Sequence, residues 1–295
     1  MNDTDDIKLE GEIAGGGLSF SKIRTFMLCG MKFYYAYVEK LKWTPPAKMI
    51  LGRAFHSAQE FGVKQMLERS TPPADMVNDY AVASYESELK AEPNVEYDEN
   101  DPNAEVVKDD LVKMAGPVFE HEVSKLTPIS SERAFEVDVA GVLVRGRLDI
   151  EDKHDDGVAI TELKTGVRNP ELLSAFDIQQ SFYQLSRPRV RLLRKIFTKR
   201  HMDKARNISV TIYEKQPDPP SLTRDIVAFC GRVAEAIKSA SIHGFVKATD
   251  LTTCSWCGFK KTCRPEIFGH EDQAAQYVQS KVVFTTKPKK IKKET

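Results

Sequence analysis

No run of apolar residues in this sequence approaches the ~20 that a helix needs to cross a bilayer. The acidic segment 1–12 is not followed by an apolar stretch that could act as a signal sequence. No GxxxxGK[ST] phosphate loop occurs either, which excludes a recognisable ATP-driven motor. We therefore expect a cytoplasmic or nucleoid-associated protein, of cellular or viral origin, and any ATP-driven step would need a partner.

The sequence also has no net charge, because 43 Lys and Arg balance 43 Asp and Glu. The two signs are nevertheless separated along the chain. Acidic residues dominate 92–110, whereas basic residues gather in 187–200 and in 281–295. Such segregation can create a phosphate-attracting face on a neutral protein, although a solvated surface or an unstructured end is the alternative. We predict DNA-backbone contacts from three residues of the first basic stretch: Arg187, Arg189 and Arg191.

The 295 residues allow one sizeable core with a small appendage. We predict an acidic flexible leader at 1–17, a single catalytic domain at 18–280 and a basic tail at 281–295. The domain divides into a mainly helical part, an α/β core and a helix with a cysteine-rich segment, in this order: 18–130, 131–215 and 216–280.

Helical patterns are typical of the N-terminal part. Ser19 or Ser21 fits the N-cap of a first helix, and 49–67 also reads as helical. The stretch 92–103 is rich in Pro, Asn and acids and predicts a mobile loop.

From Glu132 onward the periodicity changes to two, which predicts strands. The later elements follow as strands at 142–150, 158–164 and 208–213, a helix from Asn169-Pro170 to about Ser186, and an amphipathic helix at 226–237. This order predicts an α/β fold.

Glu162 and Lys164 lie two residues apart in a predicted strand, so they project to the same face. A two-residue turn at Asp155-Asp156 pairs residues whose numbers add to 311, which sets Asp149 opposite Glu162 with Cβ atoms ~5 Å apart. Two carboxylates so close repel each other unless a cation lies between them, and Mg²⁺ or Mn²⁺ suits oxygen ligands. A surface salt-bridge cluster is the alternative interpretation.

Further motifs occur in a fixed order over most of the chain: Ser19-Phe20-Ser21 through Cys29 and Tyr37, Gly52-Arg53-Ala54-Phe55-His56, Gly146-Arg147-Leu148-Asp149, Glu162-Leu163-Lys164-Thr165-Gly166, Gln179 with Tyr183, and the C-terminal cysteines. With these motifs the sequence resembles the PD-(D/E)xK nuclease superfamily. More narrowly it resembles the RecB-like exonucleases, which include the iron–sulfur nucleases of CRISPR adaptation and of the AddB type. Leu148 stands where the family name has a Pro, a departure that RecB-like members often share.

The resemblance implies a restriction-endonuclease-like core, with a central mixed sheet flanked by helices. It also implies that His56, Asp149 and Glu162 ligate Mg²⁺ or Mn²⁺, although a lone His on a helix is more often structural. Lys164 would orient or activate the attacking water. Gln179 and Tyr183, four apart on one helix face, would position Lys164 and the DNA backbone.

Three more residues near the predicted site have weaker assignments. Arg145 and Arg147 alternate with Asp149 in the same orientation and are predicted phosphate contacts. Glu132 matches an acidic position often found in this group, and whether it touches the metal site is open.

Cys254, Cys257 and Cys263 are too densely spaced to be incidental in a cytoplasmic protein, where clustered thiols usually bind metal. Cys29 and Cys230 are the candidates for a fourth ligand, and Cys230 lies on the apolar stripe of its helix. In the iron–sulfur nucleases a cysteine at the position of Cys29 supplies the first ligand. The resemblance thus implies a [4Fe–4S] cluster on Cys29, Cys254, Cys257 and Cys263, which would join the helical N-terminal and cysteine-rich C-terminal segments. Zinc is the rival metal, but its Cys₄ sites usually come as two CxxC pairs.

The sequence therefore predicts a metal-dependent DNA exonuclease that acts on single strands or ends in repair, recombination or replication-linked processing. Its partners would be DNA and a helicase or recombination protein. A non-catalytic nucleic-acid-binding or scaffold subunit that keeps the nuclease fold is the alternative.

Overall fold

The computed structural model describes the following residues: 17–139, 141–166, 175–187, 189–202, 205–239, 245–248, 253–254 and 257–264. The chain divides into two compact units, Met1–Lys247 and Ala248–Thr295. The sequence interpretation drew no boundary at this position. None of the described helices is both long and apolar enough to span a membrane.

One six-stranded sheet forms the centre of the first unit, in the order β1-β3-β4-β5-β6, with β2 also paired to β3. Its strands are Leu18–Ser19 (β1), Pro128–Val139 (β2), Val142–His154 (β3), Gly157–Gly166 (β4), Val190–Arg200 (β5) and Ile208–Lys215 (β6). The pairs β1/β3 and β4/β5 are parallel and the others are antiparallel. The sheet is therefore mixed, as expected. The sequence interpretation missed β5 and the two-residue strand β1.

The hairpin between β3 and β4 has the predicted register. Its partners run from His154↔Gly157 to Ile150↔Thr161, so each pair of numbers adds to 311. Asp155 and Asp156 form the turn, and Asp155 takes a left-handed conformation with φ of 41°. This conformation is more accessible to Asp than to most residues because its short polar side chain can bond locally.

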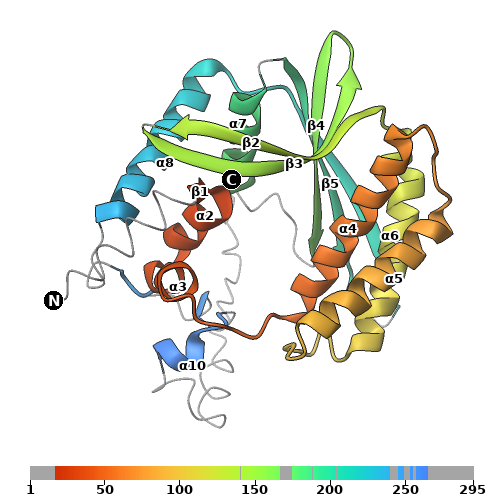
Figure 1. Cartoon of the computed structure of the whole chain (residues 1–295), viewed down its shortest axis with the longest axis horizontal. Helices are drawn as coiled ribbons and strands as arrows, with labels where there is room; N and C mark the ends of the chain where they lie inside the picture. Colours follow the sequence, from red (N-terminus) through yellow and green to blue (C-terminus); the bar gives the residue numbers. More distant parts are fainter. Residues whose placement is uncertain are drawn as a thin grey trace, which may run out of the picture. The chain divides into compact units, whose positions relative to one another are not determined.

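Three long helices cover one face of the sheet (Figure 1). They are α4 (Ala47–Leu67), α5 (Ala74–Ala91) and α6 (Ala104–His121). Their buried apolar residues pack with Ile150, Leu163 and Ile196, which come from β3, β4 and β5. The predicted helix at 49–67 is confirmed, and it lies directly over the strands that carry the predicted acidic pair.

The opposite face is covered by helices from two distant parts of the sequence (Figure 1). They are α2 (Phe20–Leu28), α3 (Gly30–Phe33) with the π-helix Tyr34–Val38, α7 (Ala175–Ser186) and α8 (Pro220–Ser239). Ser19 is the N-cap of α2, and its hydroxyl accepts a hydrogen bond from the Lys22 N–H at 3.2 Å. Helix α7 ends at Ser186 as predicted, whereas its predicted start at Asn169-Pro170 lies outside the described residues.

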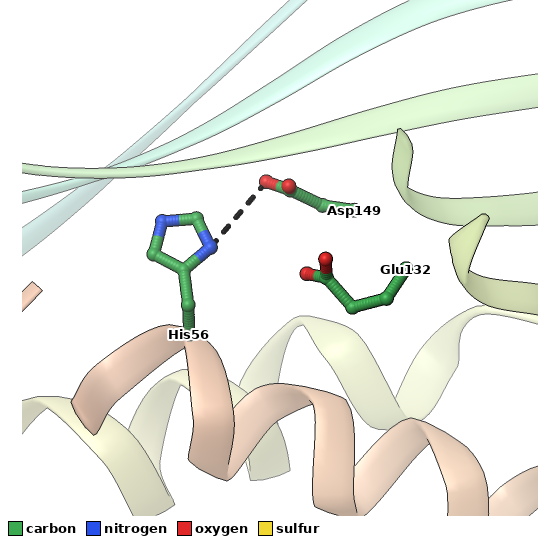
Figure 2. A group of neighbouring side chains, drawn as sticks. All are labelled: His56, Glu132 and Asp149. Carbon is green, nitrogen blue, oxygen red and sulfur yellow. Dashed lines mark ion pairs between the residues drawn. The ribbon is translucent and has the colours of Figure 1, made fainter. Parts of the chain in front are cut away.

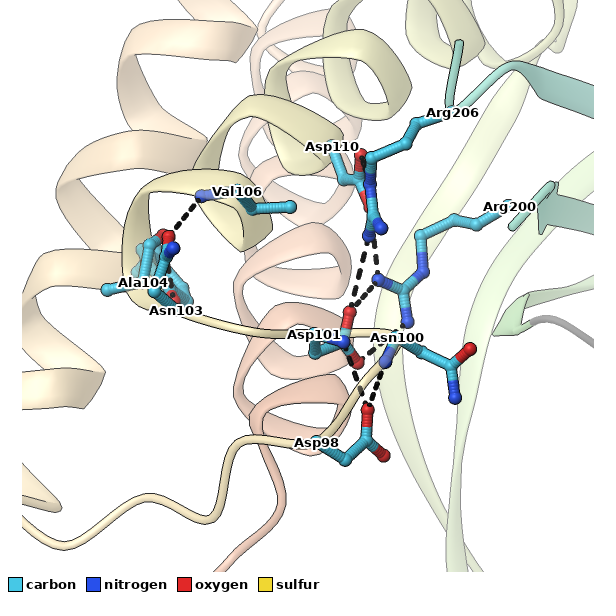
Figure 3. Close-up of polar contacts among 10 residues, drawn as sticks. Asp98, Asn100, Asp101, Asn103, Ala104, Val106, Asp110, Arg200 and Arg206 are labelled. Carbon is cyan, nitrogen blue, oxygen red and sulfur yellow. Dashed lines mark hydrogen bonds and ion pairs between the residues drawn. The ribbon is translucent and has the colours of Figure 1, made fainter. Parts of the chain in front are cut away.

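The loop between α5 and α6 is fastened by a buried network of charges (Figure 3). Arg200 at the end of β5 binds Asp101 of the loop, with Nη1–Oδ1 at 2.5 Å and Nη2–Oδ2 at 3.2 Å. Asp110 of α6 accepts from both Arg200 and Arg206. The segment 92–103 has no helix or long strand, but the anchoring of Asp101 was not anticipated by the prediction of a mobile loop.

Candidate active site

The predicted site lies where β3 and β4 separate. Their last ladder pair is Ile150↔Thr161, so Asp149 and Glu162 share the predicted register without being ladder partners. The Leu163 N–H donates instead to the Asp149 carboxylate, Oδ2, at 2.8 Å. The carboxylate thus satisfies a backbone donor that the parting strands would otherwise leave without a ladder partner.

Side-chain alternation along β3 is interrupted at this point. Leu148 packs in the same cluster as Tyr183 of α7, whereas Ile150 packs against the helices α4 to α6 on the other face. In a regular strand, residues two apart face the same side. The interruption lets Asp149 reach toward α4 although the neighbouring strand sends Glu162 toward α7.

Three side chains from three elements form a candidate metal site: His56 of α4, Glu132 of β2 and Asp149 of β3 (Figure 2). One ligand atom from each lies within 4.8 Å of the others, and this is the single such group of His, Cys, Asp or Glu found among the described residues. His56 Nδ1 is 3.6 Å from Asp149 Oδ2. Two carboxylates and an imidazole are a donor set that suits Mn²⁺ and, through the oxygens, Mg²⁺.

The approach of α4 to the end of β4 positions His56. Gly52 lies one turn before His56, and a Cβ at Gly52 would be 3.5 Å from Thr165 Oγ1. The two predicted motifs therefore meet in space.

Glu132 is directly opposite Asp149 in the β2–β3 register. The flanking partners are Ser131↔Ile150 and Arg133↔Leu148, while Glu132 itself is left out of the ladder. Its φ of +48° is a left-handed value that costs energy in a residue with a side chain. The strain coincides with the position whose carboxylate joins the metal group.

A sequence signal for this position did exist. A two-residue turn at 140 and 141 pairs residues whose numbers add to 281, and Glu132 with Asp149 satisfies that sum. The arithmetic applied to the second hairpin would therefore have placed Glu132 beside Asp149.

Glu162 is buried and its two carboxylate oxygens are held by other side chains. Oε1 accepts from the Lys164 ammonium and from Gln179 Nε2, the latter at 3.0 Å, and Oε2 accepts from the Tyr183 hydroxyl. Gln179 also donates to Tyr183. The structure thus brings together all four of these predicted residues. Glu162 itself lies outside the group of three, which includes Glu132. That Glu162 ligates the metal stays a prediction.

The site is electrostatically rich in negative charge. Burial, followed by the charge of Glu162, raises the pKa of Asp149 well above its usual range. Burial also raises the pKa of Tyr183, so its hydroxyl stays protonated and donates. A divalent cation would relieve this repulsion.

His56 and Lys164 respond to the site in opposite directions. Burial, helped by the positive charge of Lys164, lowers the pKa of His56 to about 4, so the imidazole is neutral and can ligate a metal near pH 7. Burial alone would lower the pKa of Lys164, but the charges of Glu162 and Asp149 outweigh it and raise the pKa. Lys164 is therefore an ammonium, suited to orienting a ligand rather than to accepting a proton.

The predicted phosphate contacts fall into two groups. Arg147 is near the metal group, with Nη1 4.0 Å from Glu132 and 69% of its side chain exposed, whereas Arg145 pairs with Glu136 at 2.6 Å. Arg24 of α2, which the sequence interpretation did not single out, is exposed and close enough to Lys164 to influence its pKa.

Arg189 and Arg191 of the basic stretch lie toward the turn between β3 and β4, whereas Arg187 contacts β3 two residues from Asp149. Val190 pairs with Val158, four residues or ~13 Å along β4 from Glu162. Arg187 forms a two-pronged ion pair with Glu151, and Arg191 forms one with Asp156. Arg189 is exposed near the same turn.

The cysteines occupy both units. Cys29 separates α2 from α3, and its Sγ accepts from the Lys32 N–H at 3.4 Å. Cys230 is fully buried in an apolar cluster, which raises its pKa to about 11. In the second unit Cys254, Cys257 and Cys263 are each half-buried, and Cys263 ends the short helix α10 (Lys260–Cys263).

Comparisons with known proteins give a fold and a family. Among curated proteins none matches the sequence. The crystal structure described as a "Putative exonuclease" from Eubacterium rectale is 11% identical, covers 81% of this chain and 86% of its own, and has a TM-score of 0.50. This likeness supports the expected restriction-endonuclease-like fold and, at such low identity, nothing more. The structure of SSO0001 is 14% identical over 83% of this chain and 95% of its own, but its TM-score of 0.35 carries no argument.

The family comparison extends over most of the chain. The sequence model of the PD-(D/E)XK nuclease superfamily matches residues 17–264, which include His56, Asp149, Glu162, Lys164 and the three C-terminal cysteines. The chain belongs to the PD-(D/E)XK nuclease superfamily.

Proposed function

We propose that this protein is a metal-dependent DNA exonuclease that hydrolyses phosphodiester bonds in single strands or at DNA ends. The observation that carries the proposal is the placement of a His–Glu–Asp ligand group beside the Glu162–Lys164 pair. A scaffold subunit would have no need for three carboxylates gathered around one imidazole and one ammonium.

The residues of the site have separable roles. His56, Glu132 and Asp149 would hold the divalent ion, which when bound supplies a hydroxide-like nucleophile near neutral pH and stabilises charge on the phosphate. Glu162 holds Lys164 in place, and it can approach the ion if its contacts with Gln179 and Tyr183 rearrange. The Lys164 ammonium would donate hydrogen bonds to the attacking water or to a phosphate oxygen.

Substrate and pathway follow from weaker observations. Arg147 and Arg24 are exposed beside the site and can contact phosphates, which favours a nucleic-acid backbone as the substrate. The "exonuclease" in the description of the E. rectale structure favours digestion from ends. A role in repair, recombination or replication-linked processing would pair the chain with a helicase or recombination protein, because the sequence has no phosphate loop of its own.

We also propose a [4Fe–4S] cluster on Cys29, Cys254, Cys257 and Cys263. The donor set fits this group, because four thiolates are the usual ligands of such a cluster. Burial keeps Cys230 a protonated thiol, which supports its exclusion from the ligand set. Anaerobically purified protein should be brown, with about four irons per chain. Stoichiometric zinc without iron would overturn the assignment.

The activity is tested with end-labelled DNA, single- and double-stranded, linear and circular, incubated with Mg²⁺, Mn²⁺ or EDTA. We expect metal-dependent release of mononucleotides or short fragments from linear DNA, no cleavage in EDTA, and circles that remain intact. Asp149→Asn should not cleave in any of the metals. Its matched control is Asp156→Asn, because the exposed Asp156 carboxylate lies at the turn of the same hairpin, away from the site. Intact protein that binds DNA but cleaves none of these substrates with any of the metals would favour the scaffold alternative.

A further inference from the structure

A partly exposed pair of stacked aromatic rings joins α4 and α5, with Tyr80 exposed and Phe61 half-buried. The Phe61 and Tyr80 ring centroids are 4.4 Å apart and their planes differ by 6°. Tyr80 is 42% exposed, and Met76, one turn earlier on the same face of α5, is 48% exposed. A cluster of solvent-exposed apolar side chains is a feature of binding surfaces.

Core packing does not require this pair. The buried residues of α5 are Val77, Ala81 and Tyr85, whose centre lies about 100° around the helix from Tyr80. Antiparallel helices α4 and α5 run side by side (Figure 1), and the Arg53–Glu88 ion pair lies farther along the same seam. The two rings therefore cover the solvent-facing side of the α4–α5 interface, whose inner side is occupied by the buried core residues.

On α4, Phe61 lies between one and two turns beyond His56 of the metal group. Phe61 follows His56 by five residues, a rise of ~7.5 Å along α4, which is about two nucleotides at ~3.4 Å each. The Lys64 ammonium binds Glu60 at 2.6 Å, which raises its pKa first, and the charges of Tyr80 and Glu132 raise the pKa further. Lys64 is three residues after Phe61 on α4, so the two are neighbours on the helix surface, and 59% of the Lys64 side chain is exposed.

We propose that Phe61 and Tyr80 form a stacking platform for a base of single-stranded DNA, beside Lys64, which binds the adjoining phosphate. The proposal rests on the proposed nuclease function and adds to it a base-binding subsite. Aromatic rings accept any base because every base has a π-face, so the platform would bind single strands without sequence preference. Lys64 would exchange Glu60 for the phosphate, which has the opposite charge to its own.

Binding in EDTA tests the platform without cleavage. The full chain is titrated into two fluorescein-labelled oligonucleotides of equal length, one with bases and one abasic, and anisotropy gives Kd for each. Tyr80→Ala should weaken binding of the base-bearing strand by about 5- to 100-fold and leave the abasic strand within about twofold. Tyr80→Trp should restore the difference. The matched control is Phe229→Ala, which removes a ring that is 37% exposed on α8.

Equal weakening of both strands by Tyr80→Ala, or no weakening of either, in a variant that melts at the temperature of the intact chain would overturn the proposal. If Tyr80→Ala lowers the melting temperature, the intact chain supplies the test. It is irradiated with an oligonucleotide that contains 5-iodouracil, and a crosslink to Phe61 or Tyr80 is expected. A crosslink confined to other peptides would reject the platform.

These results are separable from those of the cleavage assay. Base-dependent binding that persists in a chain that never cleaves DNA would contradict the nuclease function and support the platform. A chain that cleaves DNA but binds both oligonucleotides with equal affinity would support the nuclease function and contradict the platform.

Discussion

Two groups of charge in this protein, one buried and one partly exposed, differ in how their charges are balanced. Around Arg200, two arginines face two aspartates, Asp101 and Asp110, and every charge has an opposite partner (Figure 3). Around Asp149, two acids lie with a His that burial keeps neutral (Figure 2). The first group is balanced internally and fastens the structure. In the second, Glu132, Asp149 and Glu162 share the charges of Lys164 and Arg147, which leaves one negative charge that a metal cation would balance.

The largest effect on the cleavage rate is expected from removal of Lys164, which lies beside the acids of the candidate metal site. Lys164→Ala should lower the rate of DNA cleavage by about 10²- to 10⁴-fold, because the ammonium acts at the reacting phosphate or water. The melting temperature should fall less than on breaking the balanced group, because Gln179 and Tyr183 still bond the Glu162 carboxylate. Single-turnover rates and thermal melts, with Lys153→Ala as the exposed control on the neighbouring strand, separate the two effects. A variant that cleaves at the rate of the intact chain would remove Lys164 from the site.

Breaking the balanced group should have the opposite outcome. Asp110→Ala leaves Arg200 and Arg206 without one shared partner and should destabilise the fold by about 3–5 kcal/mol. Cleavage per folded molecule should be unchanged. Urea unfolding measures the loss, with the exposed neighbour Asp109→Ala as the control. A loss no greater than that of the control would show that the buried network does not fasten the loop.

Glu132→Gln sharpens the comparison within the acidic group. The substitution keeps the shape of the side chain and removes one charge, so the Mn²⁺ concentration for half-maximal cleavage should rise by about 10- to 100-fold. In EDTA the variant should be as stable as the intact chain or more stable, because a source of repulsion is gone. If the Mn²⁺ concentration for half-maximal cleavage does not change, Glu132 is not a ligand and Glu162 is the third ligand.

A third charged pair gives a smaller effect that depends on pH. Burial would raise the pKa of Glu151, but the bonds from Arg187 and Ser130 outweigh it and hold the pKa below its usual range. The unfolded chain therefore binds this proton more readily, so the stabilisation is present above the ordinary pKa and is lost as pH falls through the lowered one. Glu151→Gln should flatten the acid limb of stability against pH by at most about 1.4 kcal/mol per unit. Exposed Glu120→Gln should leave the limb unchanged.

Cys230→Ser should have the smallest effect on iron content among the cysteine variants. It places a hydroxyl among apolar residues, at a cost of about 1–3 kcal/mol. Iron content should stay that of the intact chain, whereas Cys254→Ser should lose the iron. Bleaching by Cys230→Ser and not by Cys29→Ser would reverse the choice of the fourth ligand.

The sequence predicted local geometry better than it predicted long-range partners. The turn at Asp155-Asp156 fixed the register of β3 with β4, and the two-residue spacing placed Glu162 and Lys164 together. Both inferences needed only the backbone periodicity of a hairpin. Glu132 was left open because its strain and its place opposite Asp149 follow from the other hairpin, whose register was not worked out.

Strand β5 was missed because its charged residues resemble a solvated surface. Arg194 binds Asp152 and Glu214, and Arg200 binds Asp101 and Asp110. Up to 99 residues separate these partners in sequence, so a single sequence does not reveal that the arginines are neutralised. Because Arg194 and Arg200 are paired with acids, the basic stretch 187–200 does not form a basic surface along its whole length.

The most direct test of the acidic group as a metal-dependent catalytic centre is the cleavage rate of an end-labelled single strand as Mn²⁺ is titrated from EDTA to saturation. The account predicts no cleavage in EDTA, a saturable rise with Mn²⁺ in the intact chain, and no rise in Asp149→Asn. Cleavage at the same rate in EDTA, or a rise in Asp149→Asn equal to that of the intact chain, would contradict it.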